Sequence, residues 1–412
     1  MRLIYTLGIY LYTLGIRAAA LCGHRNARLM VQGWPRGERK VEEGEWVWFH
    51  VASLGEFEQA RPVLEACRQR HPDRHVLLSF FSPSGYEVRK NYPLADRVIY
   101  LPMDTPRNAR QLLDTYHPTV AFFVKYEFWY NYLGQLRDRG IPTYLFSSIF
   151  RKEQYFFRQS CRWFLRQLGT CFTHLFVQNE ASLQLLTQHG IQHVSIAGDT
   201  RFDRVHQIVL ADESAPLVEQ WLATDAESKV VVAGSSWEPD EALLEQYLQD
   251  HRKQLRLILA PHVVSPEHIS HIEQTFQCPT VRYSQLVAGR QPKPADRVLI
   301  IDSIGMLSKL YRYADVAYIG GGFGVGIHNT LEAVAFGKPV LFGPNYRKFQ
   351  EAVDLLAIGA AWSHSDYPTL ADHLSPLLTS TQHLNSASQA CLQYMQRNLG
   401  STNKILDTIE NS

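Results

Sequence analysis

Two glutamates stand directly after apolar segments that are typical of buried β-strands. Glu56 ends the turn His50-Val-Ala-Ser-Leu-Gly-Glu56, and Glu127 follows the apolar run 120–124 closely. Because parallel strands end at one edge of a sheet, both carboxylates are expected on the same rim. A carboxylate there acts as a general base if partial burial raises its pKa. The alternative is that Glu56 only stabilises the first turn of a helix over residues 57–70.

Other polar groups also follow predicted strands. Arg201, in Ala197-Gly-Asp-Thr-Arg-Phe-Asp203, closes the first half of the chain and is expected near a cleft between two domains. Ser235 and Ser236 follow the strand at 229–233 and place small hydroxyls at a predicted helix start. Hydroxyls and free amides at such a position suit an anion.

A glycine-rich segment, Gly320-Gly-Gly-Phe-Gly-Val-Gly-Ile-His-Asn-Thr-Leu-Glu332, follows the apolar run 315–320. The spacing predicts a strand, a glycine turn and a helix over residues 329–336 whose first amides point at a phosphate. Glu332 would then accept hydrogen bonds from ribose hydroxyls. The alternative is a glycine-rich turn that binds nothing, because a glycine-rich motif without other signals is often found in proteins that bind no phosphate. Pro261-His262 and Ser303-Ile-Gly-Met306 also follow strands and are candidates to flank a nucleotide base.

The composition is that of an ordinary globular protein, and 412 residues suffice for two domains. A net charge of +1 argues against a generally basic nucleic-acid binder. The six cysteines show no Cys-x-x-Cys or Cys/His zinc spacing. Reduced thiols in a cytosolic setting and the absence of a structural metal are therefore expected.

The N-terminal residues 3–22 are largely apolar and aromatic, but Arg17 interrupts them. The uninterrupted length falls short of the roughly 18 residues expected of a spanning helix. A basic flank that suits an anionic membrane surface consists of Arg17, His24, Arg25, Arg28, Arg36, Arg39 and Lys40. We therefore expect an amphipathic anchor over residues 1–30 that lies in the cytoplasmic leaflet of the inner membrane. A cleaved signal peptide and a buried helix of the first domain are the alternatives.

Apolar strands alternate with helical segments along the rest of the chain, which predicts parallel sheets covered by helices. In the first half the predicted strands are 45–51, 74–80, 97–101, 120–124, 142–146 and 175–177. In the second half they are 229–233, 255–259, 297–301, 314–319 and 339–342. A polar connection at 204–216 separates the halves. Two Rossmann-like doubly wound domains with a cleft between them are expected, over 31–208 and 209–412, and the last helix is free to pack back on the first domain.

Residues 150–166 interleave basic and aromatic side chains. At helical spacing Arg158, Arg162 and Arg166 form one stripe, which suits phosphates or anionic headgroups. A core helix with a solvated basic face is the alternative. Single-stranded nucleic acid would suit the same pattern, but the neutral net charge argues against it.

Six motifs in this order resemble one known family. They are Ser-Leu-Gly-Glu56, Glu127-Phe-Trp-Tyr-Asn, Gly-Asp-Thr-Arg201-Phe-Asp, Asp302-Ser-Ile-Gly, His-Asn329-Thr-Leu-Glu-Ala and Phe-Gly-Lys-Pro339-Val-Leu-Phe-Gly-Pro. The chain resembles the 3-deoxy-D-manno-octulosonic acid (Kdo) transferases of lipopolysaccharide synthesis, inverting enzymes with a GT-B fold. The resemblance extends to about residue 360. Other GT-B transferases share the final motifs, so the first two discriminate.

The resemblance implies a role for each matching residue. Glu56 would be the base that deprotonates the acceptor hydroxyl, and Glu127 and Arg201 would support the transition state. The positions implied to bind CMP are Pro261, His262, Gly305, Met306, Leu307, Asn329, Thr330, Leu331 and Glu332. CMP-Kdo is the implied donor, a lipid A precursor (lipid IVA) the implied acceptor, and no metal or other cofactor is implied.

Four positions depart from the family pattern. Arg201 stands where Lys is more usual, His262 where Arg is common, Lys125 where an acid is frequent and Thr330 where Pro is frequent. Two other enzymes of the same fold stay open as alternatives. A membrane-associated transferase that uses a UDP-sugar would not need Glu56 in this turn, and a sugar-nucleotide epimerase would not need the N-terminal anchor.

Overall fold

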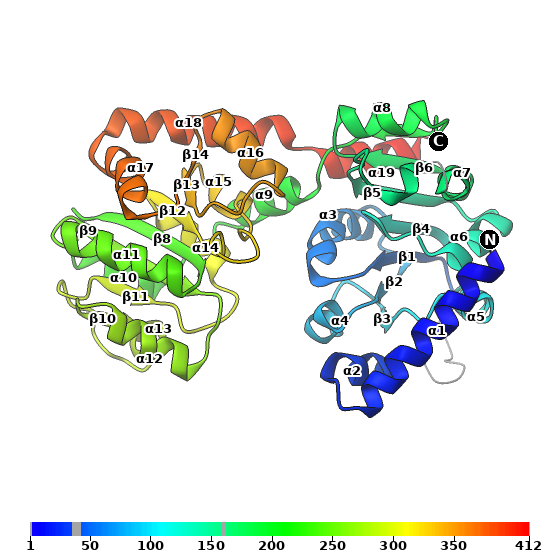
Figure 1. The fold of residues 1–412 in the computed structure, drawn as a ribbon, viewed down its shortest axis with the longest axis horizontal. Coiled ribbons are helices and arrows are strands. Elements are labelled where there is room, and N and C mark those ends of the chain that lie inside the picture. The colour runs from blue at the N-terminus through cyan, green and yellow to red at the C-terminus, as the bar shows by residue number, and fades with distance from the viewer. Residues whose placement is uncertain (1, 35–42, 159–160, 412) are drawn as a thin grey trace. The chain divides into compact units, whose positions relative to one another are not determined.

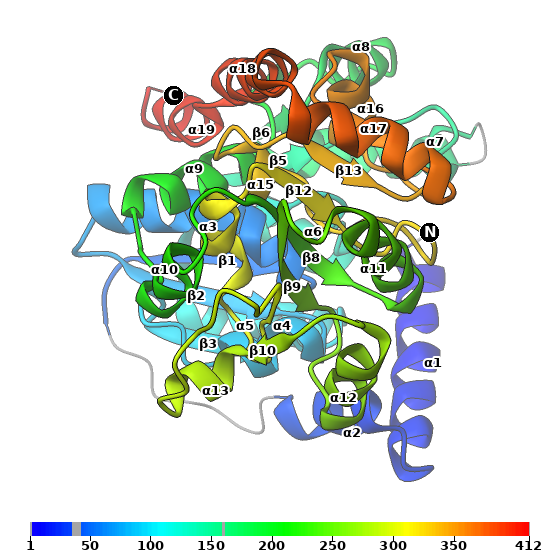
Figure 2. The same cartoon turned by 90° about the vertical axis from the view of Figure 1, so that its left-hand side faces the viewer.

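The computed structural model describes residues 2–34, 43–158 and 161–411. The chain forms two compact units: unit 1 comprises Met1–Arg204 with Asn398–Ser412, and unit 2 comprises Val205–Arg397. In each unit helices cover a seven-stranded parallel sheet (Figures 1 and 2). The predicted fold class of two Rossmann-like domains is confirmed, whereas the cleft between them stays a prediction.

The sheet of unit 1 has the strand order β3-β2-β1-β4-β5-β6-β7. Its strands are β1 Trp46–Val51, β2 His75–Phe80, β3 Arg97–Tyr100, β4 Pro118–Val124, β5 Thr143–Ser148, β6 His174–Val177 and β7 Val194–Ile196. Every residue of β1 is buried, because helices cover both faces of the sheet. The order reverses between β1 and β4, and such switch points are where ligands bind in open parallel sheets.

The helices of unit 1 come from both ends of the chain. They are α3 Leu54–Arg70, α4 Pro83–Arg89, α5 Pro106–Tyr116, α6 Tyr130–Asp138, α7 Arg162–Cys171, α8 Glu180–Gln188 and α19 Ser401–Glu410, with a 3-10 turn η1 at Tyr155–Phe157. Ile405 and Leu406 of α19 are buried in the same core cluster as Val63 and Leu64 of α3. The last helix therefore packs on the first unit.

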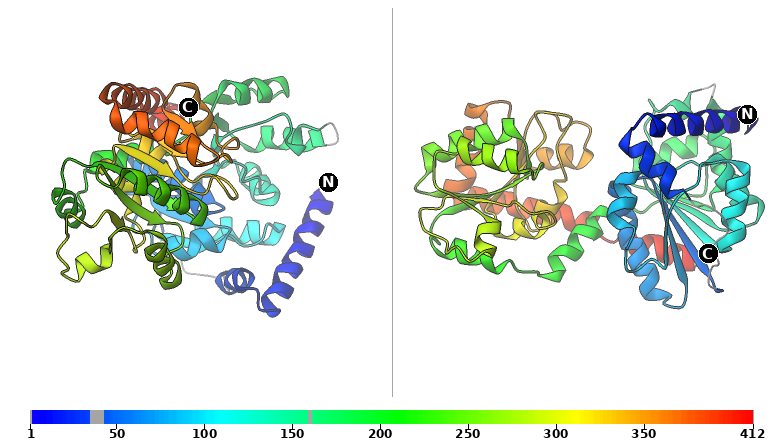
Figure 3. Two further views of the ribbon diagram at one scale, coloured as in Figure 1. Left: turned by 60° about the vertical axis from the view of Figure 1, so that its left-hand side comes forward. Right: turned by 90° about the horizontal axis from the view of Figure 1, so that it is seen from below.

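Two helices precede the sheet of unit 1, α1 at Arg2–Leu21 and α2 at Arg25–Gly33. Ile16 of α1 and Met30 of α2 pack against Tyr100 and Met103, while most of α1 runs along the outside of the unit (Figure 3). The large side chains that α1 exposes are Leu3, Ile4, Leu7, Tyr10, Leu11, Tyr12, Leu14 and Leu21.

Arg17 interrupts the charge-free run, as expected, but it lies within α1 and does not end the helix. The helix is long and apolar enough to cross a membrane, and only 11% of its apolar window is buried. The alternative of a buried core helix is therefore wrong, and an N-terminal apolar helix is available to anchor the chain. Of the predicted basic flank, Arg36, Arg39 and Lys40 lie outside the described residues.

The sheet of unit 2 has the order β10-β11-β9-β8-β12-β13-β14, with its switch point between β8 and β12. Its strands are β8 Lys229–Ser236, β9 Leu255–Pro261, β10 Thr280–Arg282, β11 Val298–Ile300, β12 Val316–Ile319, β13 Val340–Phe342 and β14 Ala361–Ser363. Its helices are α10 Pro216–Ala223, α11 Glu238–His251, α12 Pro266–Thr275, α13 Tyr283–Val287, α14 Leu307–Leu310, α15 Leu331–Val334, α16 Gln350–Ala357, α17 Tyr367–Thr379 and α18 Thr381–Asn398, with a 3-10 turn η3 at Tyr311–Tyr313.

Most of the polar connection at 204–216 is helical, because α9 spans Arg201–Ala211. One local prediction was wrong. The helix expected over 329–336 is the single turn α15, because Gly337 takes a φ of +68° and its amide bonds back to the Val334 carbonyl, which ends the helix.

Candidate active site

Glu56 lies in the first turn of α3, at the carboxyl end of β1. Its Oε2 accepts a hydrogen bond from the backbone amide of Ala52 at 2.5 Å. Ser53, at the N-cap position, makes no side-chain capping bond. The carboxylate of Glu56 therefore makes a capping contact that Ser53 does not make, as expected if Glu56 stabilises the first turn of the helix. The same contact fixes the position of the Glu56 side chain.

Glu127 follows β4 and receives two hydrogen bonds on one oxygen. His50 Nε2 lies 3.1 Å from Glu127 Oε2, and the indole nitrogen of Trp129 donates to the same oxygen at 2.7 Å. The Glu127 side chain is 12% exposed and His50 is fully buried. A backbone turn just before Glu127 makes this position possible, because Lys125 adopts a left-handed φ of +57°.

A chain of hydrogen bonds supports His50 from below the rim. The indole nitrogen of Trp48 donates to Ser79 Oγ at 2.8 Å, and Ser79 Oγ lies 2.8 Å from His50 Nδ1. Glu127 as a carboxylate only accepts, so His50 Nε2 donates to it and Nδ1 accepts from Ser79. The three donors, on Trp48, Ser79 and His50, then all point toward Glu127.

The two glutamates interact electrostatically. Burial, as the largest cause, and the nearby charge of Glu127 together raise the pKa of Glu56 to about 7, against the opposing effects of the Ala52 amide and Lys125. A carboxyl group with this pKa is about half deprotonated at neutral pH, and its carboxylate is far more basic than that of an exposed glutamate. The two acids that the sequence placed on one rim are thus brought into interaction.

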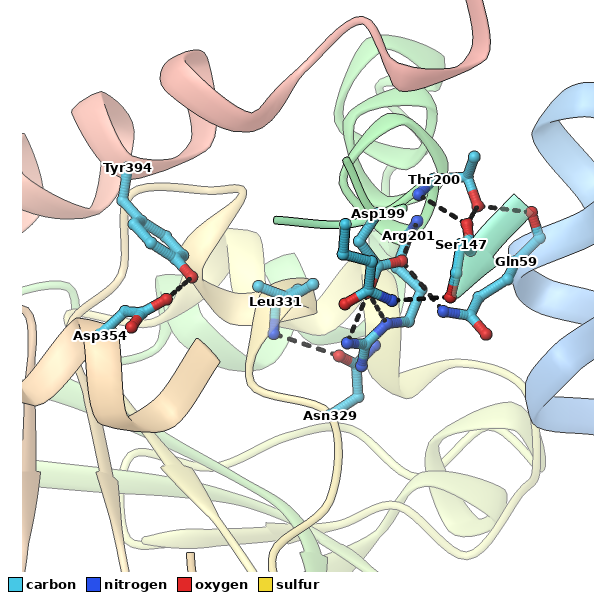
Figure 4. Close-up of polar contacts among 10 residues, drawn as sticks. Gln59, Ser147, Asp199, Thr200, Arg201, Asn329, Leu331, Asp354 and Tyr394 are labelled. Atoms are coloured by element: carbon cyan, nitrogen blue, oxygen red, sulfur yellow. Dashed lines mark hydrogen bonds and ion pairs between the residues drawn. The ribbon is translucent and has the colours of Figure 1, made fainter. Parts of the chain in front are cut away.

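Arg201 begins α9 and is held by Asp199. The guanidinium contacts Asp199 Oδ2 through Nε at 2.9 Å and Nη2 at 2.7 Å, and Gln59 donates to Oδ1 at 3.1 Å (Figure 4). Burial alone would raise the pKa of Asp199, but the Arg201 charge and its hydrogen bonds hold that pKa below the usual value. Arg201 is therefore oriented by an ion pair within unit 1.

Ser235 and Ser236 are the last two residues of β8, because that strand extends to Ser236 and does not end at residue 233 as predicted. Ser235 takes a left-handed φ of +53°. The buried Ser236 hydroxyl donates to Glu241 Oε1 at 2.8 Å, and His268 Nε2 lies 3.1 Å from the same oxygen. Ser236 is thus engaged within the fold, and Ser235 is the more accessible hydroxyl of the two.

His262, just past β9, is part of a stack of three rings. The His262 ring lies 4.7 Å from Trp237 and 4.6 Å from His328, both in stacked orientations. Its amide donates to the Ser236 carbonyl, which continues the register of β8 and β9 beyond Pro261. The stack brings the rims of β8, β9 and β12 together within unit 2.

The glycine-rich turn packs its backbone against neighbouring backbone. A Cβ on Gly320 would come within 2.6 Å of Ser236 Cα, and a Cβ on Gly322 within 2.6 Å of Gly343 Cα. Asp240 fixes the turn by accepting from the Gly321 amide at 3.0 Å. Close backbone approach of this kind is the physical reason for the glycines.

The segment after the glycine turn holds the predicted ribose contact. Asn329 Nδ2 donates to Glu332 Oε1 at 3.0 Å, and Asn329 Oδ1 accepts from the Leu331 amide at 3.2 Å (Figure 4). Leu331 and Thr330 are buried, and Thr330 Oγ1 has no hydrogen-bond partner among the described residues. Glu332 is the second residue of α15 and thus lies nearer to the helix start than expected.

The third rim segment of unit 2 follows β11. Gly305 has a φ of +92°, and Ser303 Oγ donates to the sulfur of Met306 at 3.2 Å. Leu307 lies over β8, where a Cβ on Gly234 would come within 2.8 Å of its Cδ1. All candidate residues of unit 2 thus follow β8, β9, β11 or β12, the central strands of that sheet.

Sequence reasoning missed the residues that support Glu127. His50 was part of the segment 50–56 but was given no role, and no role was predicted for Ser79 or Trp129. The signal available was that His50 and Ser79 are polar residues inside otherwise apolar strands. Within the described residues, no group of three or more His, Cys, Asp or Glu side chains could hold a metal ion.

Comparisons with known proteins agree with this arrangement. A family model described as 3-deoxy-D-manno-octulosonic-acid transferase (kdotransferase) matches residues 25–204. The 3-deoxy-D-manno-octulosonic acid transferase of Bordetella pertussis is 28% identical over 382 residues, which cover 88% of this chain and 86% of that protein. The protein of the same name from Rickettsia bellii is 23% identical and covers 99% of this chain and 97% of its own length.

Solved structures show the fold. The UDP-GlcNAc 2-epimerase from Neisseria meningitidis bound to UDP-GlcNAc matches with a TM-score of 0.63 and 14% identity, over 89% of this chain and 100% of that one. The epimerase from Methanocaldococcus jannaschii has a TM-score of 0.56 and 11% identity, over 85% and 98%. These likenesses concern the GT-B type of architecture alone. The family match over residues 25–204 and the relatives that cover 88% and 99% of this chain show that it is similar to the Kdo transferases along nearly its whole length, and they support its assignment as a glycosyltransferase.

Proposed function

We propose that this protein transfers Kdo from CMP-Kdo to a lipid A precursor, with inversion at the anomeric carbon. Glu56 removes the proton from the acceptor hydroxyl as that oxygen attacks, and CMP departs with the electron pair of the broken bond. One displacement of this kind needs no covalent sugar–enzyme intermediate. Glu56 ends the step protonated and returns its proton to water.

The observation that carries the proposal is the pairing of Glu56 with Glu127 at the switch point of unit 1. Burial and the charge of Glu127 give Glu56 a pKa of about 7, which suits a general base at neutral pH. A glutamate that served only as a helix cap would gain nothing from a second carboxylate beside it. Raised carboxyl pKa values in pairs are typical of catalytic sites, although structural networks also produce them.

The rim of unit 2 supplies the features that CMP requires. The glycine turn at 320–326 brings backbone close to a phosphate, and Glu332 is an acceptor for ribose hydroxyls. The His262 ring is stacked between Trp237 and His328, so its edge is the part proposed to contact the nucleotide base. Arg201, oriented by Asp199, is the cation proposed to offset the charge of the departing CMP.

A lipid acceptor agrees with the apolar N-terminal helix. We assign α1 as the membrane anchor and place the protein on the cytoplasmic face of the inner membrane. Burial of its exposed leucines in the interface would contribute about 25 cal/mol for each Å² of apolar surface removed from water. The single helical stripe predicted for Arg158, Arg162 and Arg166 does not form, because Arg158 is extended and α7 begins at Arg162. A role of the basic segment 150–166 toward acceptor phosphates or headgroups is part of this proposal.

The test is a transfer assay with the full chain in detergent. It combines CMP-Kdo or UDP-N-acetylglucosamine with a radiolabelled tetraacyl lipid A precursor, and NMR assigns the anomeric configuration of the product. We expect Kdo transfer from CMP-Kdo with inversion and no transfer from the UDP-sugar. Transfer from the UDP-sugar alone would replace this proposal by the UDP-sugar alternative, and a retained configuration would remove the single displacement.

A further inference from the structure

A groove runs between α1 and α5 on the surface of unit 1. Neither Glu56 nor Glu127 lines it, and the proposed reaction gives it no role. Its upper part, about 530 Å³, is lined by Tyr10, Leu14, Arg17, Trp34, Met103 and Arg107, among others. A second part further along α5 shares Tyr10 and Arg107 and adds Arg110 and Asp114. Both parts fall within the size range of ligand sites, roughly 300–1,000 Å³.

The groove has an excess of positive charge. Arg17, Arg107 and Arg110 are exposed, and their guanidinium groups form no ion pair with any described residue. The carboxylate in the groove, Asp114, is already paired with Arg139 at 2.7 Å. Arg17 and Arg107 line the first part of the groove, and Arg107 and Arg110 line the second. Two arginines beside one hollow are suited to phosphate, because the guanidinium fork binds phosphate oxygens in pairs.

The other wall of the groove is apolar and continuous with the membrane-facing side of α1. Leu14 is 59% exposed and Tyr10 49% exposed, and both line the groove. Leu7 and Leu11, on adjacent turns of α1, are also exposed. A ligand that fills this site must therefore join an anionic group to an apolar part, which a soluble anion does not.

We propose that the α1–α5 groove binds the headgroup of an anionic glycerophospholipid of the membrane in which α1 lies. The lipid phosphate sits between Arg17 and Arg107, and its acyl chains continue along Tyr10 and Leu14. The inference rests on the proposed membrane association of α1 but not on the Kdo transfer reaction. Binding of a headgroup in this groove makes membrane attachment selective for anionic lipids, which burial of the apolar helix α1 alone does not.

The test measures partition of the full chain into vesicles of phosphatidylcholine, with or without phosphatidylglycerol. The double variant Arg17→Gln/Arg107→Gln is compared with Arg25→Gln/Arg28→Gln, which removes two exposed arginines from α2 outside the groove. At roughly fivefold per arginine near an anionic surface, the groove variant should bind phosphatidylglycerol vesicles about twenty-five-fold more weakly. The α2 variant loses only the diffuse attraction of the basic flank, so it should bind these vesicles several-fold more tightly than the groove variant. Phosphatidylcholine binding should not differ among the three proteins.

Three results would overturn the proposal. Equal losses in both double variants would mean that general surface charge attracts the membrane. No loss in the groove variant would leave the groove without a lipid. Displacement of the protein from phosphatidylglycerol vesicles by inorganic phosphate, but not by chloride at equal ionic strength, would identify a soluble anion as the ligand. Thermal unfolding of each variant controls for folding, and transfer in detergent separates this outcome from the proposed function.

Discussion

The rim of unit 1 carries two interacting carboxylates, whereas the rim of unit 2 carries glycines, hydroxyls and stacked rings. Both rims lie at the switch point of a seven-stranded parallel sheet, between β1 and β4 in one case and between β8 and β12 in the other. In unit 1 a buried chain of hydrogen bonds ends on Glu127, beside Glu56. In unit 2 the glycine turn packs its backbone closely against neighbouring backbone. The same scaffold thus carries the groups proposed for acid–base chemistry in one unit and those proposed for donor binding in the other.

The change expected to have the largest effect is Glu56→Gln, which should abolish chemistry without affecting the donor site. Loss of a general base typically lowers kcat by roughly 10²–10⁴-fold. The affinity for CMP, measured by calorimetry, should stay as in the wild type. The matched control is Glu180→Gln, since Glu180 is also an acid in the first turn of a helix that follows a strand of the same sheet. Full activity of Glu56→Gln would mean that Glu56 is only a helix cap.

The opposite pattern is expected in unit 2 for Gly322→Ala. The new Cβ would lie 2.6 Å from the Gly343 backbone, so unit 2 must shift at its rim, at a cost of about 1–3 kcal/mol. CMP affinity should fall, and the pH dependence of the residual activity should be unchanged.

Gly324→Ala serves as the control, because its Cβ would meet only the Gly321 carbonyl oxygen at an ordinary 3.7 Å. Thermal unfolding and CMP titration of the two variants test the comparison. Equal CMP affinity in both would show that the tight glycine packing is unrelated to the donor.

A smaller effect on turnover is expected for Ser79→Ala. The variant leaves the buried Trp48 indole and His50 Nδ1 without a partner, which costs about 1–3 kcal/mol of stability. Because His50 then holds Glu127 less firmly, kcat should fall about tenfold or less while KM for CMP-Kdo is unchanged.

Ser148→Ala provides the matched control in the same sheet. Ser148 is also buried, but its hydroxyl makes only a long 3.4 Å bond to the Phe176 carbonyl. The two variants would be compared by urea unfolding and by steady-state kinetics. If Ser79→Ala loses stability but retains kcat, the hydrogen-bond chain supports the fold alone.

The sequence predicted the features that depend on local periodicity. The long buried strands, the helices between them and the placement of both glutamates on one rim follow from apolar runs and strand ends. The short strands β7, β10 and β14 were missed, since three residues carry too little pattern to separate a strand from a loop. The helix α9 was also missed, because its polar residues concealed the helical period.

The supports of the site could not be predicted for a different reason. His50, Ser79 and Glu127 are far apart in the sequence and meet only through the order of β2, β1 and β4. The ion pair of Arg201 with Asp199 was within reach, because the two residues are two positions apart. Nothing in the sequence, however, indicated that the guanidinium turns back onto that carboxylate.

The most direct test of the central claim is the pH dependence of kcat/KM for wild type and Glu127→Gln. Burial and the Glu127 charge raise the pKa of Glu56 to about 7, and the base must be deprotonated to act. Wild-type kcat/KM should therefore fall as the pH decreases below about 7, and the variant should keep activity to lower pH because one cause of the raised pKa is gone. Two results would contradict the account. One is a wild-type kcat/KM that falls only near the ordinary pKa of glutamate, and the other is a fall at the same pH in wild type and variant.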